Sequence, residues 1–229
     1  LMAKIQSQIY QEEYALLKFW STELAKKVIQ LEKICSVILQ LDLALTRARY
    51  GRFLEGIAPD LSNQRDEDFF IQDLRHPLLV WKERFDNGQK VIPVSLEVSS
   101  QLRVIAITGP NTGGKTVTLK SVGLAALMAK AGMLLPCSGK VAIPWCEQIL
   151  ADIGDEQSLQ QSLSTFSGHL KRVNNILDAI HNSQGLVLVL LDEIGAGTDP
   201  SEGVALAIAL LKTFADRARL TIATTHFGE

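Results

Sequence analysis

The stretch that decides the fold runs from residue 109 to residue 116 and reads Gly109-Pro110-Asn111-Thr112-Gly113-Gly114-Lys115-Thr116. It completes the pattern G-x-x-x-x-G-K-S/T between an apolar run, 102–108, that predicts a strand, and a run, 116–131, that predicts a helix. In this setting the glycines let the backbone wrap around phosphate groups, and the positive end of the helix adds to the attraction. A glycine-rich turn without a ligand is the alternative, and the adjacent Lys-Thr pair argues against it.

The polar side chains of this loop have distinct predicted roles. Lys115 is expected to neutralise the β- and γ-phosphate oxygens of ATP, and the hydroxyl of Thr116 to ligate Mg²⁺. The sequence therefore predicts ATP and Mg²⁺ as cofactors. The predicted phosphate site comprises Gly109, Pro110, Asn111, Thr112, Gly113, Gly114, Lys115, Thr116 and Val117.

Two carboxylates follow a second apolar run, 186–191, that predicts a buried strand. Ligands of open α/β sheets bind at the carboxyl ends of the strands, which is where Asp192 and Glu193 are expected to lie. Asp192 is predicted to hold the magnesium through water, and Glu193 to act as the general base on the attacking water. Two such residues can also simply cap a loop, but the phosphate loop earlier in the chain favours the catalytic interpretation.

Further signals lie close to this strand end. Asp199, followed by Pro200 and by Glu202, predicts the start of a helix, and the glycines at 195 and 197 indicate a closely packed loop before it. His226 follows a strand-like run, 220–225, and is expected at the same sheet edge as Asp192. A neutral imidazole there can contact the γ-phosphate or hold the water, although a lone histidine is often only a surface residue.

The order of these runs predicts the architecture. Strands alternating with helices at 164–180 and 200–215 imply a mostly parallel sheet covered on both faces, that is, an α/β P-loop NTPase, with an edge strand at 91–98. Residues 1–50 contain neither Gly nor Pro and repeat apolar residues at helical spacing. They predict either one long helical arm, roughly 75 Å if unbroken, or an antiparallel helix pair. We place the domain boundary between 1–58, a helical lever, and 59–229, the ATPase domain.

The composition narrows the class of protein. The 229 residues are 47% apolar and 21% charged, with a formal net charge of −2, which excludes a general attraction for nucleic acid. Three cysteines without C-x-x-C spacing argue against disulfides and zinc and fit a reducing cytoplasm. No apolar run reaches membrane-spanning length, so we expect a cytoplasmic protein without a membrane partner. The patterns at both ends suggest part of a longer protein.

Several segments resemble the ATPase domain of the MutS family: GPNTGGKT, DIGDEQSLQQSLSTFSGHL, LVLLDEIGAGTDPSEGVALA and ATTH. Within that family they are similar to the second bacterial branch, which is associated with suppressing recombination rather than with mismatch repair. The branch assignment rests mainly on residues 199–203. ARARYGRFLEG and LRHPLL also resemble the junction between lever and ATPase in this branch, so the resemblance covers most of the chain.

The resemblance implies an ATP-binding-cassette-type site shared across a head-to-tail homodimer. Ser164, Thr165 and Phe166 correspond to an element at a helix N-terminus that meets the γ-phosphate held by the other subunit. Asp155 or Gln157 corresponds to a loop that couples the nucleotide to the lever, and His226 to a switch histidine. By alignment, the resemblance places Val91 and Ile92 against adenine.

The resemblance also implies what the complete protein acts on. Full-length members of this branch carry a clamp for DNA and a small nuclease-like domain, and some act on stalled ribosomes and their rRNA. The expected function is ATP hydrolysis that drives a conformational change of a dimer on branched or mismatched DNA. Endonuclease activity is not expected of this chain, which stops shortly after His226.

Two alternatives stay open. One is a transporter-type or chromosome-maintenance cassette ATPase, but those classes use a Leu-Ser-Gly-Gly-type element where this chain has Leu163-Ser164-Thr165-Phe166. The other is a nucleotide-binding switch with negligible turnover.

Overall fold

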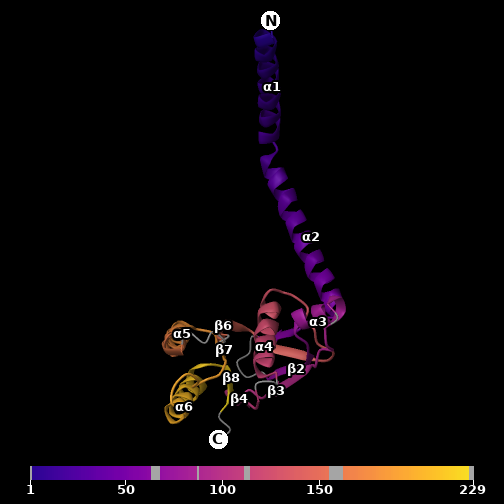
Figure 1. The fold of residues 1–229 in the computed structure, drawn as a ribbon. Coiled ribbons are helices and arrows are strands. Elements are labelled where there is room, and N and C mark those ends of the chain that lie inside the picture. The colour runs from indigo at the N-terminus through magenta and orange to yellow at the C-terminus, as the bar shows by residue number, and fades with distance from the viewer. Residues whose placement is uncertain (1, 63–67, 87, 111–113, 155–161, 227–229) are drawn as a thin grey trace. The chain divides into compact units, whose positions relative to one another are not determined.

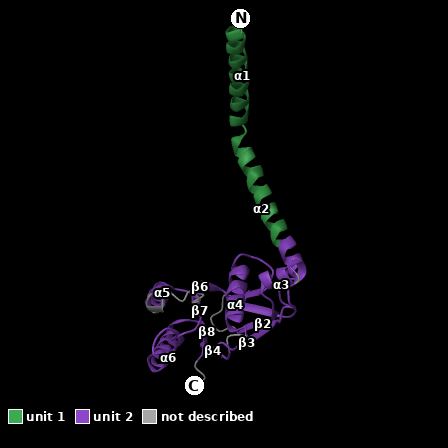
Figure 2. Cartoon of the chain, viewed as in Figure 1, with its two compact units in different colours: residues 1–47 green, residues 48–229 purple. Residues whose placement is uncertain are grey.

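The computed structural model describes residues 2–62, 68–86, 88–110, 114–154 and 162–226, with the backbone alone at 62 and 162–166. The chain divides into two compact units, Leu1–Arg47 and Ala48–Glu229 (Figure 2). The domain boundary predicted after residue 58 stays a prediction. Among the described residues, no helix combines the length and the apolar character that crossing a membrane requires.

The described part of the first unit consists of two helical segments. Helix α1 (Met2–Ala25) has no buried residue, and helix α2 (Val28–Leu54) follows after a break at Lys26 and Lys27. At this break the Lys27 amide donates to the Leu24 carbonyl at 2.9 Å, a tighter turn than that of an α-helix. The two helices do not fold back on each other (Figure 2). The long helical arm is therefore confirmed, with one interruption, and the antiparallel pair is not formed in the described part of this unit.

After the end of α2, the second unit continues with a mixed sheet. Its strands are β1 (Asp60–Ser62), β2 (Phe69–Leu74), β3 (Val94–Val98) and β5 (Val141–Pro144), in the order β1-β5-β2-β3. β1 runs parallel to β5, and β2 runs antiparallel to both of its neighbours. β3 lies at an edge of this sheet, where the sequence predicts an edge strand.

Helix α3 (Pro77–Phe85) connects β2 to the loop before β3. Its N-cap is His76, whose Nδ1 accepts a hydrogen bond from the Leu78 amide at 3.3 Å, and Pro77 occupies the first turn. Burial, and after it the charge of Lys120, lower the pKa of His76 below its ordinary value. The neutral imidazole is the form that can accept this bond, so the cap and the lowered pKa agree.

The second sheet is wholly parallel among its described pairs. It consists of β4 (Val104–Thr108), β6 (Cys146–Asp152), β7 (Leu186–Leu191) and β8 (Leu220–Thr225), in the order β4-β8-β7-β6. Helix α4 (Lys115–Lys130) contacts β6, β7 and β8, whereas α5 (Ser162–Asn182) contacts β6, and α6 (Pro200–Arg217) contacts β4 and β8. Figure 1 shows α4 on one side of this sheet and α5 and α6 on the other. The predicted α/β class with a parallel sheet is confirmed.

Strand β7 explains why the sheet needs helices on both faces. Leu188 and Leu190 belong to the core around α4, whereas Val187, Val189 and Leu191 belong to the core under α5 and α6. Successive side chains of a strand point to opposite faces, so an unbroken apolar run is buried only when both faces are covered. Both cores therefore meet at the strand that ends in the two predicted catalytic carboxylates.

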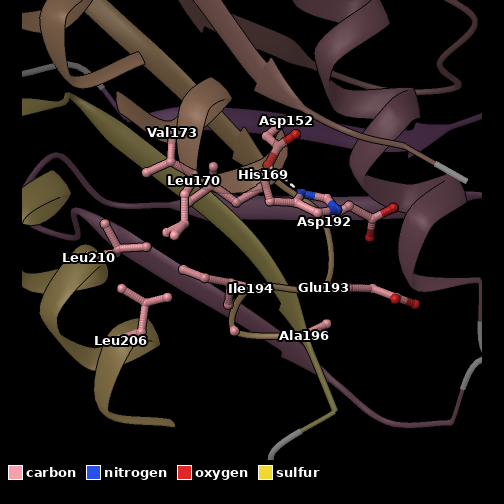
Figure 3. A pocket seen from close by; sticks show the side chains of 12 residues that line it. Asp152, His169, Leu170, Val173, Asp192, Glu193, Ile194, Ala196, Leu206 and Leu210 are labelled. Atoms are coloured by element: carbon pink, nitrogen blue, oxygen red, sulfur yellow. Dashed lines mark hydrogen bonds and ion pairs between the residues drawn. The ribbon is translucent and has the colours of Figure 1, made fainter. Parts of the chain in front are cut away.

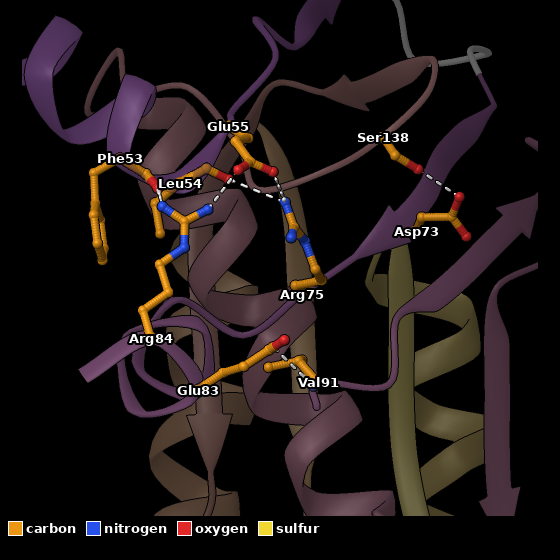
Figure 4. Close-up of polar contacts among 9 residues, drawn as sticks. All are labelled: Phe53, Leu54, Glu55, Asp73, Arg75, Glu83, Arg84, Val91 and Ser138. Carbon is orange, nitrogen blue, oxygen red and sulfur yellow. Dashed lines mark hydrogen bonds and ion pairs between the residues drawn. The ribbon is translucent and has the colours of Figure 1, made fainter. Parts of the chain in front are cut away.

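The end of α2 belongs to the second unit and is held by arginines (Figure 4). Arg84 donates to the carbonyl of Phe53, and Arg75 donates to the carbonyl of Leu54 at 3.1 Å. Glu55 follows in the left-handed region, with φ of 54°, and its carboxylate pairs with Arg84 at 2.6 Å. The last carbonyls of a helix lack partners within the helix, so these contacts satisfy and terminate α2.

Candidate active site

The phosphate loop connects β4 to α4, as the motif predicts. Gly109 has φ of 133° and Gly114 has φ of 76°, backbone conformations that side chains other than hydrogen disfavour. Gly114 is the N-cap of α4 and supplies no side-chain hydrogen bond to the first turn. The amide groups of that turn therefore suit an anion, as expected for a helix N-terminus that binds phosphate. Asn111, Thr112 and Gly113 lie outside the described residues.

Lys115 begins α4 and is buried, with 5% of its surface exposed. Its Nζ donates to the carbonyl oxygen of Gly109, at the other end of the loop. The ammonium group thus lies within the loop that the motif assigns to phosphate, while the next residues, Thr116 and the exposed Val117, continue the helix. A buried ammonium group requires polar partners, which the loop carbonyl provides here and phosphate oxygens would provide with a nucleotide.

The structure brings Thr116 and Asp192 together from elements far apart in the sequence. The Thr116 hydroxyl donates to Oδ1 of Asp192 at 3.1 Å, and Asp192 is buried, with 6% exposure. A hydroxyl and a carboxylate are hard oxygen donors of the kind that Mg²⁺ prefers. The two predicted metal ligands therefore fit that ion by position and by chemistry.

Glu193 has a strained backbone that two contacts stabilise. Its φ is 51°, in the left-handed region, and its amide donates to the hydroxyl of Thr224 at 2.8 Å. His226 Nε2 lies 3.1 Å from Oε1 of Glu193, and because a carboxylate only accepts, the imidazole nitrogen is the donor. The histidine therefore orients the carboxylate that the sequence predicts as the general base.

Thr224 links the two carboxylate residues and is absent from the sequence predictions. Its hydroxyl donates to Oδ1 of Asp192 at 2.5 Å while accepting from the Glu193 amide. It is fully buried in β8. The sequence offered no specific signal for it, because β8 contains three threonines, Thr221, Thr224 and Thr225.

The backbone of the loop after Glu193 explains why the sequence has two glycines there. Gly195 and Gly197 have φ of 83° and 86°, so the turn itself requires them. Asp199 is the N-cap of α6 and accepts from the Ser201 amide at 3.0 Å, with Pro200 in the first turn, as predicted. Hydrogen bonds from Ser201, first from its hydroxyl, lower the pKa of the Asp199 carboxyl.

Other predicted site residues are placed less completely. Ser164 and Thr165 lie in the first turns of α5, which starts at Ser162, but their side chains and that of Phe166 are outside the described part. Asp155 and Gln157 also lie outside it. Of the pair predicted to contact adenine, Val91 is buried in the core, and its amide donates to Glu83 at 2.9 Å (Figure 4). Ile92 is 86% exposed. Of these two side chains, only that of Ile92 is therefore exposed, and the contact of the pair with adenine stays a prediction.

Comparisons with known proteins agree with this geometry. Residues 105–229 match the family described as MutS domain V. Proteins named Endonuclease MutS2 are similar along most of the chain. The one from Synechocystis sp. is 50% identical over 95% of this chain and 28% of its own length. Those from Shouchella clausii and Halothermothrix orenii are each 42% identical, over 93% and 96% of this chain and 26% of their own lengths.

The chain spans about a quarter of the length of these curated relatives. The matched region contains the carboxylates, Thr224, His226 and the whole phosphate loop, and it is a P-loop ATPase domain. The phosphate loop at the start of α4, the paired carboxylates at the end of β7 and these similarities together show that the chain belongs to the MutS family.

Proposed function

We propose that this chain binds ATP with Mg²⁺ and hydrolyses it, and that hydrolysis changes the conformation of a MutS-like homodimer acting on nucleic acid. The observation that carries the proposal is the contact between Thr116 and Asp192, 3.1 Å apart, beside the buried Lys115. It joins the phosphate loop to the carboxylate strand. Membership of the MutS family supports the same conclusion.

Each residue then has a task in the proposed site. Lys115 and the amides at the start of α4 bind the β- and γ-phosphates, and Thr116 and Asp192 hold the magnesium, which neutralises phosphate charge. Glu193, oriented by His226, accepts the proton of the attacking water. Thr224 keeps Asp192 and Glu193 in fixed relation through its two hydrogen bonds.

The partners belong to the same proposal. We propose composite sites in which Ser164 and Thr165 of one subunit complete the phosphate site of the other, and DNA that is branched or mismatched as the target of the complete protein. Stalled ribosomes and their rRNA are a second target class. The relatives are named endonucleases, and we assign to this chain the ATPase part of such a protein.

Two substitutions test the proposed site. Lys115→Ala is expected to abolish ATP binding in calorimetry, because the phosphate charge loses the cation of the loop. Glu193→Gln is expected to keep binding and to stop phosphate release, because an amide of the same shape cannot accept a proton. Lys212→Ala and Glu97→Gln, at exposed positions of α6 and β3, serve as controls.

The outcomes separate the alternatives. Unchanged ATP affinity in Lys115→Ala would refute the phosphate site, and hydrolysis by Glu193→Gln at the parental rate would place the base elsewhere. Binding without any phosphate release in the parental protein would favour the nucleotide switch.

Mixed dimers test the shared site. Chains carrying Ser164→Arg and chains carrying Lys115→Ala are each expected to be inactive alone. When mixed, the intact loop of the first faces the intact α5 of the second, which restores at most about a quarter of the parental rate. If mixed dimers form, as crosslinking would show, and no activity returns, Ser164 does not act across the interface.

A further inference from the structure

A second buried carboxylate lies beside the proposed site and has no role in the proposed chemistry. Asp152 is the last residue of β6, with 3% of its surface exposed. Its carbonyl accepts a hydrogen bond from the Asp192 amide at 2.9 Å, so the two aspartates end neighbouring strands. Burying a carboxylate is unfavourable unless it is paired and hydrogen-bonded, so its surroundings require an explanation.

Both oxygens of Asp152 bind residues of α5. Oδ1 accepts from Nε of Arg172, and Oδ2 lies 2.7 Å from Nδ1 of His169, which must carry the hydrogen because the carboxylate only accepts. We call these three residues the Asp152 cluster. It connects the end of β6 to the N-terminal half of α5 by charge-assisted hydrogen bonds, which are stronger than neutral ones.

Among the described side chains of α5, those that join the apolar core lie beyond the Asp152 cluster. In the N-terminal half of the helix, none of the described side chains, 167–172, is buried, whereas Val173, Ile176 and Ile180 further along the helix belong to the apolar core. Next to the cluster lies a cavity of about 30 Å³, lined among others by Asp152, His169, Asp192 and Glu193 (Figure 3). Over its described side chains, 167–172, this half of α5 is therefore held to the sheet by the polar contacts of the Asp152 cluster.

The cluster lies close to the element proposed to act on the partner's nucleotide. His169 is five positions beyond Ser164, which corresponds to about 7.5 Å along a helix. A shift of the N-terminal turn of α5 would break the bonds to Asp152. The backbone carbonyl of Asp152 also accepts from the Asp192 amide, so one residue contacts both the metal ligand of its own subunit's proposed site and the helix proposed to complete the partner's site.

We propose that Asp152 is a positioning residue that fixes the N-terminal half of α5 to the carboxylate end of the sheet, so that this helix start meets the nucleotide of the second subunit. The proposal rests on the proposed function for its catalytic consequence. Its structural part, the attachment of α5, does not depend on ATP hydrolysis. The two parts are tested separately.

The attachment is tested by amide hydrogen exchange on the complete protein carrying Asp152→Asn. The amide keeps the size of the side chain but removes the charge and presents an N–H group to one of two donors. We expect exchange in 163–172 to become at least about tenfold faster while 173–182 stays protected by the core. Glu147→Gln is the matched control, since Glu147 is a carboxylate of the same strand that contacts Ser183, beyond the other end of α5.

Arg172→Gln is a second test variant, which keeps the attachment testable if Asp152→Asn misfolds, because Arg172 is half-exposed and lies at the surface end of the cluster. The same pattern of faster exchange is expected, with unchanged thermal unfolding. Exchange in 163–172 that stays at the parental rate in both variants would overturn the attachment. Equal acceleration by Glu147→Gln would also overturn it.

The catalytic consequence is tested by kinetics and by mixed dimers. Asp152→Asn is expected to lower kcat about ten- to hundredfold, the effect of a small misplacement, with KM for ATP changed by less than about twofold. Mixing with Lys115→Ala chains should restore activity, because the intact loop of the Asp152→Asn chain then faces an intact α5. Absence of rescue would mean that Asp152 acts on Asp192 within its own subunit and would overturn the proposal. Failure of the proposed function is detected by a different experiment, because it would leave the ATP affinity of Lys115→Ala unchanged.

Discussion

Replacing Thr224 with valine removes one hydroxyl from the middle of the proposed site and leaves the shape of the side chain nearly unchanged. The hydroxyl donates to the Asp192 carboxylate at 2.5 Å and accepts from the Glu193 amide at 2.8 Å, and Thr224 is fully buried. A hydrogen bond to a charged group contributes about 1.5–3 kcal/mol, and an amide left without a partner costs about 1–3 kcal/mol. The slightly larger apolar burial of valine offsets part of this sum. We therefore expect a loss of about 3 kcal/mol in the free energy of unfolding.

The same strand provides a matched control. Within the described residues, the hydroxyl of Thr221 is buried and has no hydrogen-bond partner. Valine at this position removes an unsatisfied polar group, so Thr221→Val is expected to leave stability unchanged or to raise it by about 1 kcal/mol. The two variants carry the same chemical change, three residues apart, and differ only in the contacts that the hydroxyl makes.

Urea denaturation of both variants checks the comparison, with ATP turnover measured in parallel. Thr224→Val should also lower kcat, because the strained backbone of Glu193 loses its hydrogen bond. A free energy of unfolding for Thr224→Val within about 0.5 kcal/mol of the parental value, the range of ordinary surface substitutions, would refute the proposed role of the hydroxyl. An equal loss of stability in Thr221→Val and Thr224→Val would refute it as well.

Three further predictions concern single side chains. Burial raises the pKa of both Cys137 and Cys146 to about 11, so N-ethylmaleimide at neutral pH should label only the exposed Cys35 in the native protein; a second label by mass spectrometry would contradict this. The lowered pKa of His76 favours the neutral imidazole in the folded state. The contribution of His76 to stability is therefore present above pH 6.5 and is lost as the pH falls through the lowered pKa. His76→Asn, which keeps an N-cap acceptor, should therefore reduce the loss of stability between about pH 7 and 5 in urea denaturation, and an unchanged loss would contradict the role. Phe214→Ala, at a fully buried position of α6, should lower the free energy of unfolding by about 3–5 kcal/mol, and a loss below about 1 kcal/mol would contradict its place in the core.

The sequence predicts three of the four strands of the parallel sheet, β4, β7 and β8, because their signals are local. The apolar runs 186–191 and 220–225 form β7 and β8. The helix predicted at 200–215 is α6, which ends two residues later, at Arg217. Residues 141–152 carry two strands that were not predicted, β5 and β6. β5 ends at Pro144, a residue that disfavours strands, and polar residues interrupt β6. Their strand conformation depends on pairing with β1, β2 and β7, which lie far away in the sequence.

The candidate site also contains residues that the sequence predicts and residues that it does not. Lys115, Thr116 and the two carboxylates follow from motifs whose spacing encodes their chemistry. Thr224 and Asp152 do not, because a threonine in a buried strand and an aspartate at a strand end have many possible uses. Their tasks arise from neighbours that only the folded chain brings close, such as the backbone of Glu193 and the side chain of Arg172.

The strand order β4-β8-β7-β6 has a consequence for how the site is assembled during synthesis. β4 and β6, the edge strands of the parallel sheet, come first in the chain, and β7 and β8, the two central strands, come last. The edge strands have no direct pairing with each other, so α4 and its phosphate loop are made before the two strands that complete the surface on which α4 packs. A nascent chain that ends before residue 186 therefore carries Lys115 and its loop without either carboxylate and without the two central strands. The sheet, both of its cores and the nucleotide site are completed together, when the last two strands insert between the first two.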